Sequence, residues 1–170
     1  MRYIFILLIV FLSISAQAQS KTTENLQKKY SESLALFFYN NTLRMVNLSE
    51  DKEFDELIKD IEKMKFLMIK KAGFEKADYK KLINDYKSEA FEEMMTSRHD
   101  GKNFDVYMKD GKSKGMIVTV NDDENLYVLD IVGSFPLNKV SKLFSTIDSS
   151  SEIGKRIKDF ASHDKEEETH

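Results

Sequence analysis

Residues 102–133 read KNFDVYMKDGKSKGMIVTVNDDENLYVLDIVG, and this stretch decides the fold. In its first half, apolar and polar residues alternate with a period of two, which is typical of β-strands that bury one face. The breaks at Asp110-Gly111 and at residues 121–125 are rich in the Asn, Asp and Gly residues that favour tight turns. The pattern therefore predicts consecutive strands joined by short hairpin turns.

The same pattern continues at both ends of this stretch. Residues 126–132 are almost continuously apolar, with Asp130 as the exception, which is typical of a strand buried on both faces. On the N-terminal side, residues 91–96 alternate again and are followed by the turn residues Asp100-Gly101. We therefore expect four strands in an antiparallel meander.

Strands and amphipathic helices are predicted around the meander. Residues 34–39 and 66–69 are short apolar runs that favour two more buried strands, and the capping side chains at Asn40 favour a short helix over 40–47. Three longer stripes have helical spacing: Phe54, Leu57, Ile58, Ile61 and Met64; Tyr79, Leu82, Ile83 and Tyr86; and Leu137, Val140, Leu143, Phe144 and Ile147. A short final helix is expected around residues 153–160. The predicted fold class is α+β: an antiparallel β-meander with amphipathic helices packed mainly on one face.

The first 18 residues have the organisation of a secretory signal peptide. Arg2 provides a positive start, residues 3–12 are apolar, and residues 16–18 (AQA) form a small-x-small cleavage site. A membrane anchor is the alternative, but the apolar run is short for the roughly 20 residues of a spanning helix. We therefore expect cleavage after Ala18 and export to the periplasm or the extracellular space.

The mature chain is expected to have three parts. Residues 19–32 are a polar N-terminal segment that we expect to be loosely ordered, and residues 33–161 are expected to form a single α+β domain. Residues 162–170 are rich in acids and are expected to be a disordered tail. No segment after the signal is apolar enough to span a bilayer.

Composition excludes several classes of function. The chain has 26 Lys and Arg against 29 Asp and Glu, and this balance argues against nucleic-acid binding, which needs a basic face. Because the chain has no Cys, disulfides, thiolate metal sites, a cysteine nucleophile and a lipid anchor on cysteine are excluded. Its His and carboxylate residues do not cluster at the spacing of metal ligands. We therefore expect no metal or cofactor, and no catalytic residue is assigned.

Two matches to catalytic motifs are better explained by local structure. Residues 111–115 (GKSKG) fit the G-x-S-x-G nucleophile pattern, but that motif requires a strand followed by a helix, and here two alternating segments flank it. We interpret these residues as a hairpin turn. Residues 49–52 (SEDK) fit S-x-x-K without its companion motifs, and we interpret them as the start of a helix.

Four residues are candidates for a ligand-binding or structural polar site: Arg44, Asp130, Tyr39 and His99. Arg44 is flanked by apolar residues, and the pattern predicts that it pairs with Asp130, which interrupts an apolar strand. A buried pair of this kind more often fixes geometry than performs chemistry, with ligand binding as the alternative. His99 lies beside a predicted turn, where an exposed loop position and a functional one are both open.

Several segments resemble a known family. These are residues 37–45 (FFYNNTLRM), 54–58 (FDELI) with 63–67 (KMKFL), and 127–133 (YVLDIVG). Together with the export signal, they resemble the secreted domain-of-unknown-function family numbered 4252, which is widespread in Bacteroidota. The similarity spans roughly residues 29–147. It implies a bacterial envelope or exported protein of about this size, and it implies no activity, cofactor or catalytic residue.

These observations favour a non-enzymatic binding domain of the cell envelope with an envelope protein as partner. One alternative is a hydrolase-type enzyme with dispersed acid and base residues, such as His99. A pocket in which ionisable groups with shifted pKa values converge would favour that alternative. Another is a regulatory partner in an envelope stress response. A large exposed apolar patch would favour binding. The ligand and the oligomeric state stay open.

Overall fold

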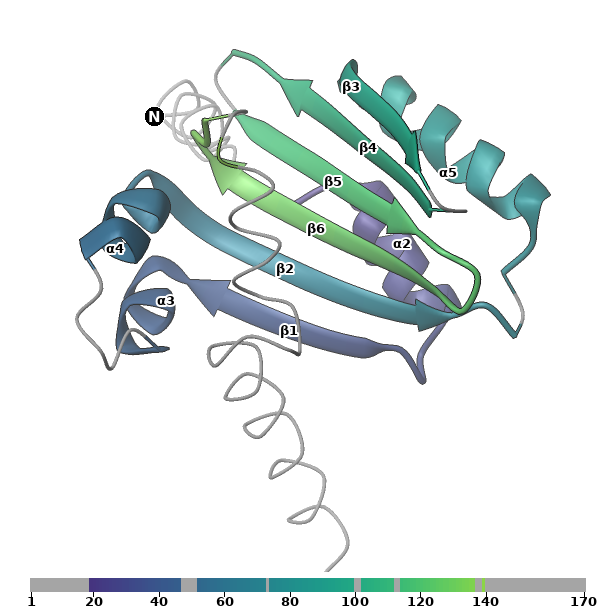
Figure 1. The fold of residues 1–170 in the computed structure, drawn as a ribbon, viewed down its shortest axis with the longest axis horizontal. Coiled ribbons are helices and arrows are strands. Elements are labelled where there is room, and N and C mark those ends of the chain that lie inside the picture. The colour runs from purple at the N-terminus through teal and green to yellow at the C-terminus, as the bar shows by residue number, and fades with distance from the viewer. Residues whose placement is uncertain are drawn as a thin grey trace, which may run out of the picture.

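The chain forms an open sheet of six antiparallel strands in a computed structural model (Figure 1). The structure describes residues 19–46, 52–72, 74–99, 102–111, 114–136 and 139. The strands are β1 (Leu34–Tyr39), β2 (Ile61–Lys70), β3 (Glu92–His99), β4 (Lys102–Lys109), β5 (Gly115–Asn121) and β6 (Asn125–Gly133). Their order across the sheet is β1-β2-β6-β5-β4-β3. The predicted α+β class and its antiparallel meander, β3 to β6, are confirmed.

Local turn chemistry closes the hairpins of the meander. Between β5 and β6, the Asp122 carboxylate accepts hydrogen bonds from the backbone N–H groups of Glu124 (2.9 Å) and Asn125 (2.7 Å). Between β4 and β5, Gly111 has a φ of 106°, in the region that favours glycine. These short connections fix the strand register, because the length and type of a hairpin turn determine which residues pair across it.

β2 extends the sheet beyond the meander, and it is longer than the sequence suggested. It pairs with β6 along one side and with β1 along the other. The expected helix through Ile61 and Met64 is therefore wrong at its C-terminal end, since α4 (Lys52–Ile58) stops six residues before Met64. The Asn40 side-chain amide donates to the carbonyls of Ile58 (3.0 Å) and Ile61 (2.9 Å), which fixes the reversal between helix and strand.

The described helices lie on both faces of the sheet, whereas the sequence predicted helices mainly on one face. The longer helix α5 (Lys76–Ser88) and α2 (Lys21–Lys29) pack on one face, which we call the α5 face (Figure 1). The short helices α3 (Asn40–Val46) and α4 lie at one end of the opposite face.

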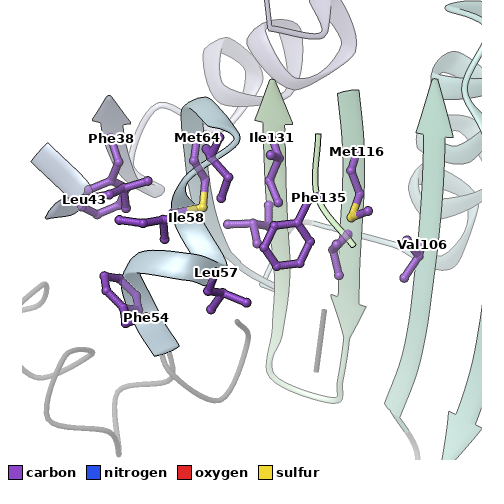
Figure 2. Packing of buried hydrophobic residues seen from close by; sticks show 13 residues of the cluster. Phe38, Leu43, Phe54, Leu57, Ile58, Met64, Val106, Met116, Ile131 and Phe135 are labelled. Atoms are coloured by element: carbon purple, nitrogen blue, oxygen red, sulfur yellow. The ribbon is translucent and has the colours of Figure 1, made fainter. Parts of the chain in front are cut away.

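Each face has its own apolar core. On the α3–α4 side, Leu43, Phe54 and Leu57 pack against strand residues such as Met64 and Ile131 (Figure 2). On the α5 face, the core members are Leu26, Leu67, Ile69, Phe74, Leu82, Tyr86, Phe91, Tyr107, Ile117, Leu126 and Val128. Alternation along the strands divides their side chains between the two cores, as the period of two requires.

Residues 21–29 form a helix, whereas the polar composition of this region favoured a loosely ordered segment. The Ser20 hydroxyl caps the helix by accepting from the Thr23 N–H (3.3 Å). The Glu89 carboxylate, at the end of α5, accepts from the N–H groups of Lys21 (3.0 Å) and Thr22 (2.6 Å). Because a residue nearly 70 positions away satisfies these N–H groups, sequence periodicity could not reveal the helix.

Ala90 follows α5 with a φ of 67°, a conformation that costs a residue with a Cβ atom about 1 kcal/mol. The N–H groups of Ala90 and Phe91 donate to the carbonyls of Lys87 and Tyr86, which closes the helix end. We therefore expect Ala90→Gly to raise the free energy of unfolding by about 1 kcal/mol, measured by urea denaturation. Unchanged or lower stability would show that the backbone conformation of Ala90 is not strained.

Several predictions lie outside the described residues. They are the signal peptide over 1–18, the helix from residue 137, the final helix around 153–160 and the acidic tail over 162–170. Within the described residues, α2 packs on the sheet, so the folded region extends to the N-terminal side of residue 33.

Candidate functional site

The α5 face of the sheet carries polar side chains next to the first half of α5. β4 contributes Asn103, Asp105 and Tyr107 at alternate positions, and β5 contributes Thr119 and Asn121. Asp105, Tyr107 and Thr119 are buried. A buried carboxylate is costly unless it is hydrogen-bonded, so its partner on the helix matters.

Tyr79 of α5 is that partner. Its hydroxyl donates to the Asp105 carboxylate and lies 2.9 Å from the Thr119 hydroxyl oxygen. Burial and the bond to Asp105 raise the pKa of Tyr79 well above its usual value near 10. Burial also raises the pKa of Tyr107, with the charge of Asp105 adding to the effect. Both phenols therefore stay protonated at physiological pH and act as neutral hydrogen-bonding groups.

A cavity of about 480 Å³ opens beside this network, between α5 and strands β3 to β5. Its lining includes Asp105, Tyr107 and Asn121 from the sheet, and we call these three the floor. We call the cations that line it the rim: Lys71, Lys76, Lys80 and Arg98. Two carboxylates, Glu75 and Glu93, line the cavity as well. The volume falls within the range of small-molecule sites, roughly 300 to 1,000 Å³.

Some polar groups of the cavity have hydrogen-bond partners, and one does not. The Arg98 Nε donates to the Asn103 side-chain oxygen (2.7 Å), and Glu93 accepts from Lys87 (3.1 Å) and from the Thr96 hydroxyl (3.0 Å). In contrast, the buried Asn121 Oδ1 has no hydrogen-bond partner in the part of the chain that the structure describes. A buried acceptor without a hydrogen-bond partner is uncommon in folded proteins.

The two tyrosines of the cavity are not poised for proton transfer near neutral pH. A general acid or base works best when its pKa lies near the operating pH, whereas the pKa values of Tyr79 and Tyr107 move away from it. His99, the base suggested by the sequence, ends β3 opposite Lys102, and its side chain is outside the described part. The ionisable groups that converge here can hold and orient a polar molecule.

A second polar cluster surrounds Asp130, which is 1% exposed in β6. Its carboxylate accepts from the Ser20 N–H (3.0 Å). Burial raises the pKa of Asp130 to about 6, although the Thr23 hydroxyl, the Ser20 N–H and the charge of Lys65 act in the opposite direction. Burial lowers the pKa of Lys65, and the Asp130 charge counteracts it. This cluster attaches α2 to the sheet.

The structure does not bring Arg44 and Asp130 together. Asp130 accepts from Ser20, next to α2 on the α5 face, while Arg44 is exposed on α3, which packs on the opposite face. Among the described residues, the ion pairs do not include Arg44. Adjacent residues of a helix point in different directions, so Leu43 can be buried while its neighbour Arg44 faces solvent.

Tyr39 lies instead in an exposed apolar segment. Three large apolar side chains between positions 37 and 45 face solvent: Phe37 is 51% exposed, Tyr39 65% and Met45 74%. Phe37 and Tyr39 belong to the edge strand β1, and Met45 belongs to α3, which follows it directly. We call Phe37 and Tyr39 the β1 edge patch, since Met45 lies on α3, which packs on the opposite face of the sheet.

Sequence reasoning missed Tyr79, Asp105 and Asn121 as site residues. The spacing of Tyr79 places it on an apolar helical stripe, and nothing in the sequence indicates a hydrogen-bond partner for its hydroxyl. A signal was present in the strands, because residues 103–107 and 117–121 place polar side chains on the face opposite the apolar ones. A sheet face that is both polar and covered by a helix indicates a site.

Two further properties concern the described residues only. In the described ranges, no group of three or more His, Asp or Glu side chains is placed to hold a metal ion. Among the described helices, none is both long enough and apolar enough to cross a membrane.

Comparison with known proteins gives a family. No curated protein and no solved structure matches the chain. A family model described as "Domain of unknown function (DUF4252)" matches residues 18–143. This match covers α2 and every strand of the sheet, and it confirms the family resemblance carried by residues 37–45, 54–58, 63–67 and 127–133. The chain therefore belongs to the DUF4252 family.

Proposed function

We propose that this chain is an exported protein of the bacterial cell envelope, and that it works there as a non-enzymatic binding domain for a protein partner. Export is supported by the organisation of residues 1–18. Binding is supported by the contrast between the two edges of the sheet.

The β3 edge is protected against pairing with another strand. It carries the charged residues Glu92, Glu93 and Arg98, and the register shifts between Glu93 and Met95. Charges and bulges are the devices by which proteins prevent the edges of their sheets from associating.

The β1 edge has none of these devices. Its sequence, LALFFY, contains no charge and no proline, and its pairing with β2 is regular over all six residues. The β1 edge patch adds two exposed aromatic side chains, a type that is enriched where proteins bind each other. Within the described residues, this uncharged and regularly paired apolar edge is the observation that carries the proposal.

The partner that fits is an extended segment of another protein that adds a strand to β1. Main-chain hydrogen bonds would supply affinity, while apolar side chains against Phe37 and Tyr39 would supply specificity. The Lys65 ammonium, 4.5 Å from the centre of the Phe37 ring, holds that ring by a cation–π contact. An apolar strand is therefore preferred over a basic one, since a cation already occupies the ring.

We expect Tyr39→Glu to reduce capture of the partner at least tenfold, because it places a charge on the edge where the strand would dock. The variant should fold, since Tyr39 is exposed and pairs with Lys63, an opposite charge for the new carboxylate. The measurement uses a photo-crosslinking phenylalanine analogue at position 37 in intact cells, followed by quantification of the adduct. Met94→Glu is the matched control, because Met94 is 50% exposed on the opposite edge.

The outcomes separate the proposal from its alternatives. A discrete adduct that Tyr39→Glu abolishes and Met94→Glu preserves supports it, provided that amide exchange at residues 34–39 slows in the purified complex. An adduct insensitive to Tyr39→Glu, an adduct of the chain with itself, or no adduct at all contradicts it. Export is tested separately by mass spectrometry, which should find Gln19 as the N-terminus of the periplasmic or secreted protein.

A further inference from the structure

The cavity beside α5 has a charge pattern that specifies a ligand. We propose that it binds a small zwitterion of the free amino-acid class, with the ammonium group at the floor and the carboxylate at the rim. This site is independent of the β1 edge patch, because it lies between α5 and strands β3 to β5, whereas β1 is at the other end of the sheet.

The floor offers acceptors. Tyr79 donates to only one oxygen, Oδ2, of the buried Asp105, and a carboxylate can accept about four hydrogen bonds in total. Asn121 Oδ1 adds a buried acceptor that has no partner within the described residues. The Asp105 carboxylate, which is charged and can accept further hydrogen bonds, is suited to a group with several N–H donors and a positive charge, which an ammonium provides.

The rim offers cations. Lys71, Lys76 and Lys80 line the opening, and none of them takes part in an ion pair within the described residues. Arg98 uses its Nε for Asn103, which leaves its two terminal nitrogens for other acceptors. These cations are suited to a carboxylate, and a guanidinium can bind one through two parallel hydrogen bonds.

The two layers together select the ligand class. A simple anion would meet the Asp105 charge at the floor. A simple cation would meet a lining in which four cations outnumber the two carboxylates Glu75 and Glu93, and Glu93 already accepts from Lys87 and Thr96. A molecule that carries both charges a few ångströms apart satisfies both layers. The ring of Phe74 also lines the cavity and provides an apolar surface for a side chain.

The experiment titrates the mature chain, labelled for NMR, with each of the twenty free L-amino acids at up to about 10 mM. At least one of them is expected to shift the amide signals of Tyr79, Asp105 and Asn121. Its N-acetyl derivative, which lacks the ammonium charge, and its carboxamide, which lacks the carboxylate, are expected to bind at least tenfold more weakly. Asp105→Asn, which keeps an acceptor for Tyr79, is expected to weaken binding of the free amino acid at least tenfold.

Matched lysines provide the control. Lys80→Ala removes a rim cation and is expected to weaken binding several-fold. Lys81→Ala is expected to leave it unchanged, because Lys81 is bonded to Asp85 (2.6 Å) and does not line the cavity. The proposal is overturned if no amino acid shifts these signals, if the N-acetyl derivative binds as well as the free amino acid, or if a folded Asp105→Asn variant binds with unchanged affinity. Thermal melts of each variant show that it is folded.

Discussion

Replacing Gly133 with alanine is expected to lower the free energy of unfolding by about 3 kcal/mol or more. Gly133 ends β6 with a φ of 121°, a conformation that residues with a Cβ atom rarely adopt. A Cβ atom placed there would lie 2.3 Å from the Asp60 carbonyl oxygen and 3.0 Å from the Glu62 nitrogen. Because both are backbone atoms, the chain itself would have to move.

The surrounding hydrogen bonds oppose that movement. The Gly133 N–H donates to the carbonyl of Lys114 (3.1 Å), and the next N–H, of Ser134, donates to the Asp60 carbonyl (3.0 Å). The register between β2 and β6 also shifts at this point, between Ile61 and Lys63. An alanine at position 133 would therefore disturb the place where α4, β2 and β6 meet.

Urea denaturation of Gly133→Ala and Gly111→Ala measures this effect against a matched control. Gly111 also has a positive φ, of 106°, but a Cβ atom there meets nothing within 4 Å among the described residues. It should therefore cost only about 1 kcal/mol, from conformation alone. Equal losses in the two variants would contradict the steric explanation.

Asp130→Asn is expected to stabilise the protein at pH 8 and to have little effect at pH 4. The pKa of Asp130 is about 6 in the folded chain and near 3.8 in its ordinary state, so folding at high pH requires burial of a charge. The wild-type chain gains stability as the pH falls from about 6 to about 4, because the folded state then holds a proton that the unfolded state lacks. Two pKa units correspond to about 3 kcal/mol, which the uncharged variant recovers at pH 8.

Unfolding of both proteins between pH 4 and pH 8 measures this difference, and Glu89→Gln provides a control of opposite sign. Burial alone would raise the pKa of Glu89, but hydrogen bonds from Thr22, Ser20 and Lys21 outweigh it and lower the pKa. Glu89→Gln should therefore destabilise the chain at neutral pH, and the loss should shrink below about pH 4.5. A stability difference for Asp130→Asn that does not depend on pH would show that its carboxylate titrates normally.

Much of the fold could be predicted because its signals are local. The alternation in β4 and β5 and the turn residues between them identify the meander without reference to any other part of the chain. β2 shows where such reasoning ends. Its residues 61–64 continue the apolar spacing of α4, yet they form a strand because β1 and β6 pair with it on both sides.

The predicted polar residues show the same contrast between local and long-range information. Asp130 was singled out because a charge interrupts an apolar strand, and it is buried as that pattern suggests. Its partner was expected to be Arg44, but the carboxylate instead accepts from Ser20, 110 positions away in the sequence. Which groups satisfy a buried charge depends on how the elements pack, and strand patterns do not encode this.

By itself, the sequence determined the strand pattern, the fold class and the family, because periodicity, turn chemistry and segment similarity are properties of neighbouring residues. Only the tertiary structure decided that α2 is a helix, that Tyr79 meets Asp105, and that β1 lies at an edge of the sheet. Each of these depends on contacts between distant parts of the chain. Their energies arise from burial and hydrogen bonding, which exist only once the sheet has assembled.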